Sequence, residues 1–267
     1  MSEQSMRSEG AGYSFGERLQ GRYRRTAARW LSRKPVAFRS DRPIVSFTFD
    51  DFPRSALHVG GAILKKYGGT GTYYTSMGLM GTETPTGTMF LAGDIETLLR
   101  NGHELGCHTF DHCHPWETPP ERFEASLVQN QRALTALFPQ AVFRTMSYPL
   151  KVPSPGNKRI AGRHFDCCRG RGDRSNLGTV DLNFLASYFL ERKLGGPQAA
   201  LKAIEENRVQ RGWLIFSTHD LSADPTPYGW TPEYFETVVR AAAESGARIL
   251  PVLSALESLS QGIPDRP

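Results

Sequence analysis

From about residue 43 onward, short runs of apolar and β-branched residues alternate with longer segments of helical periodicity. Regular alternation of this kind predicts a parallel sheet with helices packed outside it. The predicted strands are Ile44–Phe49, Thr70–Met77, His103–His108, Ala141–Tyr148, His164–Arg169, Trp213–Thr218 and Ala247–Val252. The predicted helices between them include Asp94–Gly102, Pro119–Phe138, Pro197–Arg208 and Thr231–Gly246.

Seven strand–helix units favour a barrel over an open doubly wound sheet, although the pattern alone is compatible with both. We therefore predict an α/β fold, a distorted (β/α)7 TIM-like barrel that is either complete or incomplete. It is expected to span residues 43–258 as one domain, followed by a loose tail at residues 259–267.

Residues 1–42 form a basic N-terminal extension. Its segment 16–34 holds seven Lys and Arg residues, and apolar residues recur every four positions at Leu19, Tyr23, Ala27 and Leu31. This spacing predicts an amphipathic helix. Such a helix can lie on an anionic membrane surface. We favour packing against the following domain, for example as a cap at the bottom of the barrel, which uses the same pattern.

The composition is that of an ordinary soluble protein, with 39% hydrophobic and 22% charged residues among 267. Four cysteines are too few for a disulfide framework, and the N-terminal segment lacks the apolar core of a secretory signal, so we expect a cytoplasmic protein with reduced thiols. The net charge of +5 is mildly basic. Without a recognition motif it does not predict nucleic-acid binding.

Polar side chains gather at the carboxyl ends of four predicted strands, where parallel barrels place their reacting groups. They are Asp50 and Asp51 after the first strand, His108 and His112 at the third, Arg144 and Tyr148 at the fourth, and His219 after the sixth. Two histidines four residues apart face the same way if their segment is helical. With one carboxylate and a position for water they form the ligand pattern of catalytic zinc. An HxxxH pair alone is weak evidence, and its placement beside paired acids strengthens it.

The adjacent carboxylates of Asp50 and Asp51 allow two interpretations. Acidic residues after a strand are ordinary turn chemistry. Alternatively, because neighbouring side chains of an extended segment point in different directions, one carboxylate can bind a metal while the other faces the water that the metal activates.

The segments TFDDFP, HELGCHTFDH, FRTMSYP and FSTHD, in this order, resemble the motifs of the polysaccharide deacetylase family, the chitooligosaccharide-deacetylase-like carbohydrate esterases. The resemblance covers about residues 43–258. It implies a hydrolase that removes an N-acyl group, most commonly acetyl, from an amino sugar of a glycan or glycan precursor, with one divalent metal ion, preferably Zn²⁺.

Position by position, the resemblance implies that Asp51, His108 and His112 bind the metal and that Asp50 is the general base. Thr109 would brace the loop between the histidines. Three further roles follow from it: Arg144 would orient Asp50, the Tyr148 backbone N–H would bind the oxyanion, and His219 would be the general acid.

The chain departs from the family motifs in three places. Phe52 stands where the family usually has glycine, and we expect it to narrow or reshape the mouth of the site. Residues 145–147 replace prolines of the third motif. The fourth motif has no tryptophan here, and Asp173 is the predicted partner of His219.

The segment CCRGRGDRSN contributes Arg169, Arg171 and Arg174. These arginines can hold a phosphate or carboxylate of the substrate, which would make the partner an anionic nucleotide-linked or lipid-linked sugar or an acidic glycan. A solvated loop whose arginines pair with nearby acids explains the pattern equally well. Trp230, with Trp116 and Tyr228, is a candidate for packing on a sugar ring.

Other functions stay open. A deformylase, or another amidohydrolase acting on a non-sugar amide, would use the same metal and base. From a different class, the chain could be a non-catalytic barrel that binds a glycan or nucleotide sugar. The presence of both Asp50 and His219 favours catalysis over that alternative.

Overall fold

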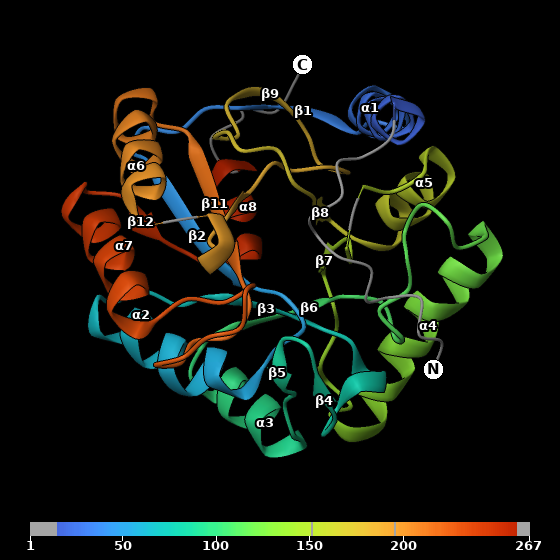
Figure 1. Ribbon diagram of the computed structural model, residues 1–267, viewed down its shortest axis with the longest axis horizontal. Coiled ribbons are helices and arrows are strands. Elements are labelled where there is room, and N and C mark those ends of the chain that lie inside the picture. The colour runs from blue at the N-terminus through green and yellow to red at the C-terminus, as the bar shows by residue number, and fades with distance from the viewer. Residues whose placement is uncertain (1–14, 151, 195, 261–267) are drawn as a thin grey trace.

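The computed structural model describes residues 15–150, 152–194 and 196–260, which contain a curled sheet with helices around its outside (Figure 1). The eight strands of this sheet pair in parallel throughout. They are β2 (Ile44–Phe49), β3 (Thr72–Thr75), β6 (Glu104–Cys107), β7 (Thr145–Ser147), β8 (Cys167–Arg169), β10 (Tyr188–Phe189), β11 (Trp213–Thr218) and β12 (Arg248–Ile249). The prediction of an incomplete (β/α)7-type barrel is confirmed.

The strand order is β10-β11-β2-β3-β6-β7-β8, and β12 also pairs with β2. Residues 182–189 connect the two edges of this half-barrel. At one end of this segment the Leu185 N–H donates to the Cys168 carbonyl at 2.8 Å, and at the other end β10 pairs with β11. The segment thus bridges the gap between β8 and β11. Because all strands of the sheet are parallel, their carboxyl ends lie on one face.

All seven predicted strands are present, most of them shorter than predicted. The helices are α1 (Phe15–Trp30), α2 (Ala62–Lys66), α3 (Ala92–Arg100), α4 (Pro120–Leu137), α5 (Pro155–His164), α6 (Gln198–Gln210), α7 (Pro232–Glu244) and α8 (Val252–Ser260), with short turns η2 (Ala56–Gly61), η3 (Met77–Leu79) and η4 (Arg192–Leu194). Two small antiparallel pairs were not predicted: β1 (Pro35–Phe38) with β9 (Gly178–Asp181), and β4 (Glu83–Thr84) with β5 (Gly87–Thr88).

Helix α1 lies beside α5 (Figure 1). Its contact is made through buried Ala27 and Ala28, and the buried Lys158 ammonium of α5 donates to the carbonyls of Ala28 and Leu31. Leu19 and Tyr23 of the predicted apolar face stay 60% and 65% exposed. A second contact comes from the middle of the helix, where Tyr23 meets the Trp116 ring edge-on at 6.1 Å and Arg24 pairs with Glu117 at 3.1 Å.

Both ends of the chain extend beyond the described residues. Residues 1–14 of the basic extension and residues 261–267 of the predicted tail lie outside them, whereas residues 259 and 260 belong to α8. Among the described helices, none has the length and apolar character needed to cross a bilayer.

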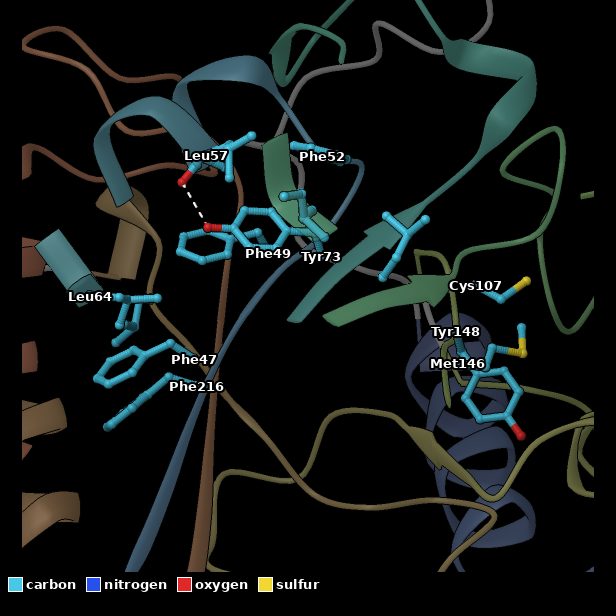
Figure 2. Packing of buried hydrophobic residues seen from close by; sticks show 14 of the residues in the cluster. Phe47, Phe49, Phe52, Leu57, Leu64, Tyr73, Cys107, Met146, Tyr148 and Phe216 are labelled. Carbon is cyan, nitrogen blue, oxygen red and sulfur yellow. Dashed lines mark hydrogen bonds between the residues drawn. The ribbon is translucent and has the colours of Figure 1, made fainter. Parts of the chain in front are cut away.

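The core is built from aromatic stacks on the strands next to the site. Phe47 stacks on Phe216, and Phe49 stacks on Tyr73 with ring centroids 4.7 Å apart. Figure 2 shows these rings on one side of the cluster, with Cys107, Met146 and Tyr148 on the other. This packing fixes the strand from which Asp50 and Asp51 emerge.

His103 at the start of β6 is expected to make the stability of the fold depend on pH. Its Nδ1 accepts the Gly71 N–H at 3.0 Å, and burial lowers the pKa of His103 to about 4. The unfolded chain binds this proton near pH 6.5. The stabilisation is therefore complete above about pH 6.5 and is lost as the pH falls toward 4.

Urea titrations from pH 7 to 4 test this. The variant His103→Asn keeps an acceptor for the Gly71 N–H but cannot bind this proton. Between pH 7 and 4 its unfolding free energy should fall less than that of the wild type, by a difference of at most about 3 kcal/mol. Equal pH slopes for the wild type and the variant would show that His103 does not titrate in this way.

Candidate metal centre and catalytic site

Asp51, His108 and His112 meet at the carboxyl ends of β2 and β6. The Asp51 Oδ1 atom lies 3.5 Å from His108 Nε2 and 3.2 Å from His112 Nε2. Ligand atoms of the three side chains all lie within 4.8 Å of one another. The sequence-predicted ligand set is therefore brought together.

The two ligand loops depend on backbone conformations that non-glycine residues rarely adopt. Asp51 and Phe52 have φ values of 63° and 59°, and Thr109 and His112 have 62° and 53°. The segment of the two histidines is not helical, since residues 108–114 form an irregular loop. Two left-handed residues turn this loop so that both imidazoles face Asp51, and the Thr109 hydroxyl braces it by accepting the Cys113 N–H at 3.1 Å.

The donor set fits a divalent ion. The Asp51 Oδ1 atom is buried and has no hydrogen-bond partner among the described residues. Tetrahedral zinc, with bonds of about 2.0–2.1 Å, separates neighbouring ligand atoms by roughly 3.3 Å, and the two distances from this oxygen bracket that value. Two imidazoles and one carboxylate are also the donors that zinc prefers in catalytic sites.

Two further contacts orient these donors. His108 Nδ1 lies 2.8 Å from the Ser147 carbonyl, so Nδ1 carries the proton and Nε2 is free to bind a metal. The Thr86 hydroxyl, from the turn between β4 and β5, donates to Asp51 Oδ2 at 2.9 Å. It occupies the second carboxylate oxygen and leaves Oδ1 as the ligand.

Thr86→Val is expected to weaken metal binding about 10- to 100-fold, because it removes the hydrogen bond that orients the ligand carboxylate. Competition with a chelating indicator measures the affinity directly. Thr88→Val changes an exposed hydroxyl of the same hairpin and should leave the affinity unchanged. Equal metal affinity of the Thr86 variant and the wild type would show that Thr86 does not orient Asp51 for metal binding.

Asp50 lies beside the metal ligands and is almost completely buried. Its Oδ1 accepts hydrogen bonds from the Arg169 guanidinium and from the Ser147 hydroxyl, and its Oδ2 accepts the Ser217 hydroxyl at 3.0 Å. Burial raises the pKa of Asp50, but the charge and the hydrogen bond of Arg169 act against burial, and the pKa lies below its ordinary value. Asp50 is therefore a carboxylate at neutral pH.

The three side chains of the candidate metal centre have shifted pKa values because they are buried and close together. Burial raises the pKa of Asp51, yet the neighbouring His112 lowers it further than burial raises it. Burial lowers the pKa of His108 to about 4, so this imidazole is neutral and can act as a ligand. For His112, the carboxylate of Asp51 outweighs burial and raises the pKa.

Arg144 does not orient Asp50, contrary to the prediction. It stands before β7, which begins only at Thr145, and therefore lies at the amino end of the sheet. Its half-exposed side chain pairs with Asp166 and Glu257. The buried arginine on Asp50 is Arg169, at the carboxyl end of β8, so the predicted substrate-binding role of Arg169 is also wrong.

The Tyr148 backbone N–H is not available for an oxyanion. It donates to the Arg169 carbonyl at 3.1 Å, continuing the pairing of β7 with β8. The Tyr148 hydroxyl is equally engaged, with the Asn183 carbonyl at 3.0 Å. The prediction for this residue is therefore wrong.

His219 follows β11 on the same face, but Asp173 is not its partner. Asp173 is exposed and lies near Arg171 at 3.8 Å. His219 Nδ1 instead lies 3.2 Å from the main-chain carbonyl of Tyr228. The buried Asp220 carboxylate accepts the N–H and the hydroxyl of Thr226, which holds the loop that presents this carbonyl.

Two predicted substrate contacts are core residues. Phe52 is fully buried and stacks on Phe90, with ring centroids 5.0 Å apart, and it also contacts Tyr73 (Figure 2). It does not shape the mouth of the site. Trp230 is 3% exposed and packs on Tyr234. Among the aromatic candidates, Tyr228 contacts His219, at 5.7 Å between ring centroids.

The two remaining arginines, Arg171 and Arg174, lie in different parts of the structure. Arg171 is half-exposed, and its guanidinium lies over the Phe189 ring. The guanidinium of Arg169 contacts the same ring, so Phe189 separates Arg171 from the ion pair of Arg169 with Asp50. Arg174 instead lines a pocket with residues of α1 and β9 that contains none of the metal ligands. Only Arg171 keeps a place near the site.

A half-barrel with an Asp-His-His cluster, an ionised buried aspartate and a histidine at its carboxyl face defines a hydrolase that acts on amide or ester bonds. Residues 39–154 match the family model described as "Polysaccharide deacetylase". Over that segment the chain resembles the polysaccharide deacetylase family. No curated protein matches the chain in sequence.

Solved structures share the fold. A family 4 acetyl xylan esterase from Clostridium thermocellum, in complex with a cobalt ion, is 21% identical, with 83% of this chain and 93% of that chain covered and a TM-score of 0.57. Peptidoglycan deacetylase PdaC from Bacillus subtilis, as a mutant, is 14% identical, with coverages of 83% and 93% and a TM-score of 0.54. A family 4 pseudoenzyme from Bacillus anthracis is 16% identical, with coverages of 82% and 66% and a TM-score of 0.53.

Proposed function

We propose that this protein is a metal-dependent deacetylase of N-acetylated amino sugars in a glycan or glycan precursor. The observation that carries the proposal is the buried Asp51 Oδ1 atom, without a hydrogen-bond partner among the described residues and facing the Nε2 atoms of His108 and His112. A divalent ion held there, preferably Zn²⁺, would polarise the acyl oxygen and make water a better nucleophile.

The residues around this cluster supply the proton transfers. Asp50, kept ionised by Arg169, would take a proton from the attacking water. His219, whose Nδ1 is held by the Tyr228 carbonyl, would deliver a proton from Nε2 to the leaving nitrogen. An amide needs this acid because its amine is a poor leaving group.

An anionic substrate fits the rim of the site. Arg171 presents a half-exposed guanidinium above Phe189, close enough to hold a carboxylate or phosphate of a nucleotide-linked, lipid-linked or acidic sugar. We further propose that the reaction takes place in the cytoplasm, where precursors of this kind would be substrates. Four free cysteines support that location.

Release of acetate tests the proposal. The purified protein with one equivalent of Zn²⁺ should release acetate from N-acetylated glycan fragments or sugar precursors. Asp50→Asn should lower the rate about 10²- to 10⁴-fold while the metal stays bound, because the base is lost and Asp51, His108 and His112 remain. Full turnover by this variant would exclude Asp50 as the base. Bound metal without turnover on any N-acetyl sugar would exclude the proposed reaction.

A further inference from the structure

A second polar pocket lies between α1 and the segment that leads into β9. It has a volume of about 180 Å³ and shares no residue with the metal centre. Its lining includes Arg29, Trp30, Arg33, Arg174, Leu177 and Asp181. Three of these residues are arginines and one is an acid.

The single acid of the pocket is already matched. The Asp181 carboxylate accepts the buried Lys158 ammonium at 2.6 Å and the Lys34 N–H at 2.9 Å. The same ammonium also donates to the Ala28 and Leu31 carbonyls at the carboxyl end of α1, which offsets the negative end of the helix dipole. Lys158 therefore neutralises the negative groups around the pocket.

The three guanidinium groups of the pocket, by contrast, have no close acidic partner among the described residues. Among the described residues, Arg29 and Arg174 have no acidic partner within 4.0 Å, and Arg33 only approaches Asp181 at 3.9 Å. Arg29 and Arg33 both lie over the Trp30 ring, at 5.2 and 5.5 Å. Burial and the nearby Arg29 lower the pKa of Arg174, which reflects the crowding of like charges.

The backbone next to Arg174 is fixed. Asn176 exchanges two main-chain hydrogen bonds with Trp213, at 2.8 and 3.0 Å, and its side-chain amide exchanges two more with Ala186, both at 2.9 Å. A group held on such a segment loses little further freedom when it binds a ligand. The backbone beside Arg174 is therefore ordered before a ligand binds, and the side chains of all three arginines are exposed to a ligand.

We propose that Arg29, Arg33 and Arg174 form a binding site for a phosphate group, either of a soluble phosphate compound or of a phospholipid headgroup. Planar guanidinium groups bind phosphate through paired charge-assisted hydrogen bonds. Trp30 and Leu177, which are 56% and 47% exposed, stand at the pocket and would contact the apolar part of a lipid. The site does not rest on the proposed deacetylation.

Titration calorimetry with inorganic phosphate, at constant ionic strength set with chloride, tests the site in the full-length protein. Arg174→Gln and Arg29→Gln should each weaken phosphate binding about 10-fold or more. Arg25→Gln removes the same charge from an exposed position of α1 outside the pocket and should change affinity less than twofold. Phosphate bound at a metal on Asp51 would not depend on Arg174.

Vesicle sedimentation identifies the source of the phosphate. Vesicles containing phosphatidylglycerol are compared with vesicles in which oleate supplies the same charge. Binding to the first only, lost in Arg174→Gln, supports a phospholipid headgroup, whereas binding of free phosphate alone supports a soluble compound. The site is excluded if neither probe depends on Arg29 and Arg174, or if Arg25→Gln weakens binding equally.

Discussion

Arg169→Met is expected to lower the deacetylation rate at least about 100-fold and to destabilise the fold by about 3–5 kcal/mol. The substitution leaves Asp50 buried with two serine hydroxyls but no positive partner. The carboxylate then gains a higher pKa and loses its fixed orientation. Acetate release and urea unfolding measure the two effects.

Arg144→Met is the matched control for this prediction. Arg144 makes only surface ion pairs with Asp166 and Glu257, which contribute at most about 1 kcal/mol each. Its activity should equal that of the wild type. If Arg169→Met is too unstable to assay, the double variant Asp50→Asn with Arg169→Met should recover stability, because the isolated charge is gone. Loss of activity in the Arg144 variant but not in the Arg169 variant would show that Arg144, and not Arg169, supports Asp50.

Asp51→Ala and His112→Ala should each reduce metal content from about one ion per chain to near zero and abolish acetate release. Each removes one of three protein donors, and a site left with two holds zinc poorly. Metal analysis of the purified proteins and the acetate assay give independent readouts.

His114→Ala is the control for ligand identity. His114 Nδ1 accepts the N–H groups of Trp116 and Glu117, so its ring belongs to the loop and not to the metal cluster. This variant should keep its metal. Metal lost from the His114 variant but retained by His112→Ala would show that the ligand set is wrong.

The strands and the meeting of Asp51, His108 and His112 could be predicted from the sequence because both depend on local patterns. Apolar runs and helical periodicity locate the strands, and parallel topology places Asp51 and His108 at one face. The arginine on Asp50 could not be assigned in the same way. β7 is only three residues long, and an error of a few residues in its start moves Arg144 from one end of the barrel to the other.

Other parts of the site have no local signal. Thr86 reaches Asp51 from a two-residue-strand hairpin without hydrophobic alternation. The partner of His219 is a main-chain carbonyl, which any residue at position 228 could supply. Arg169, however, stands at the end of a predicted strand, like Asp50, and that shared position was the available sign of its role.

Phe52 combines a left-handed backbone with a buried ring stacked on Phe90, and this has an evolutionary consequence. Glycine at position 52 would relieve about 1–2 kcal/mol of backbone strain but would empty an aromatic space worth about 3–5 kcal/mol. A change to glycine at position 52 is therefore costly unless position 90 changes as well. The two phenylalanines form an epistatic pair, and each limits which substitutions the other can accept.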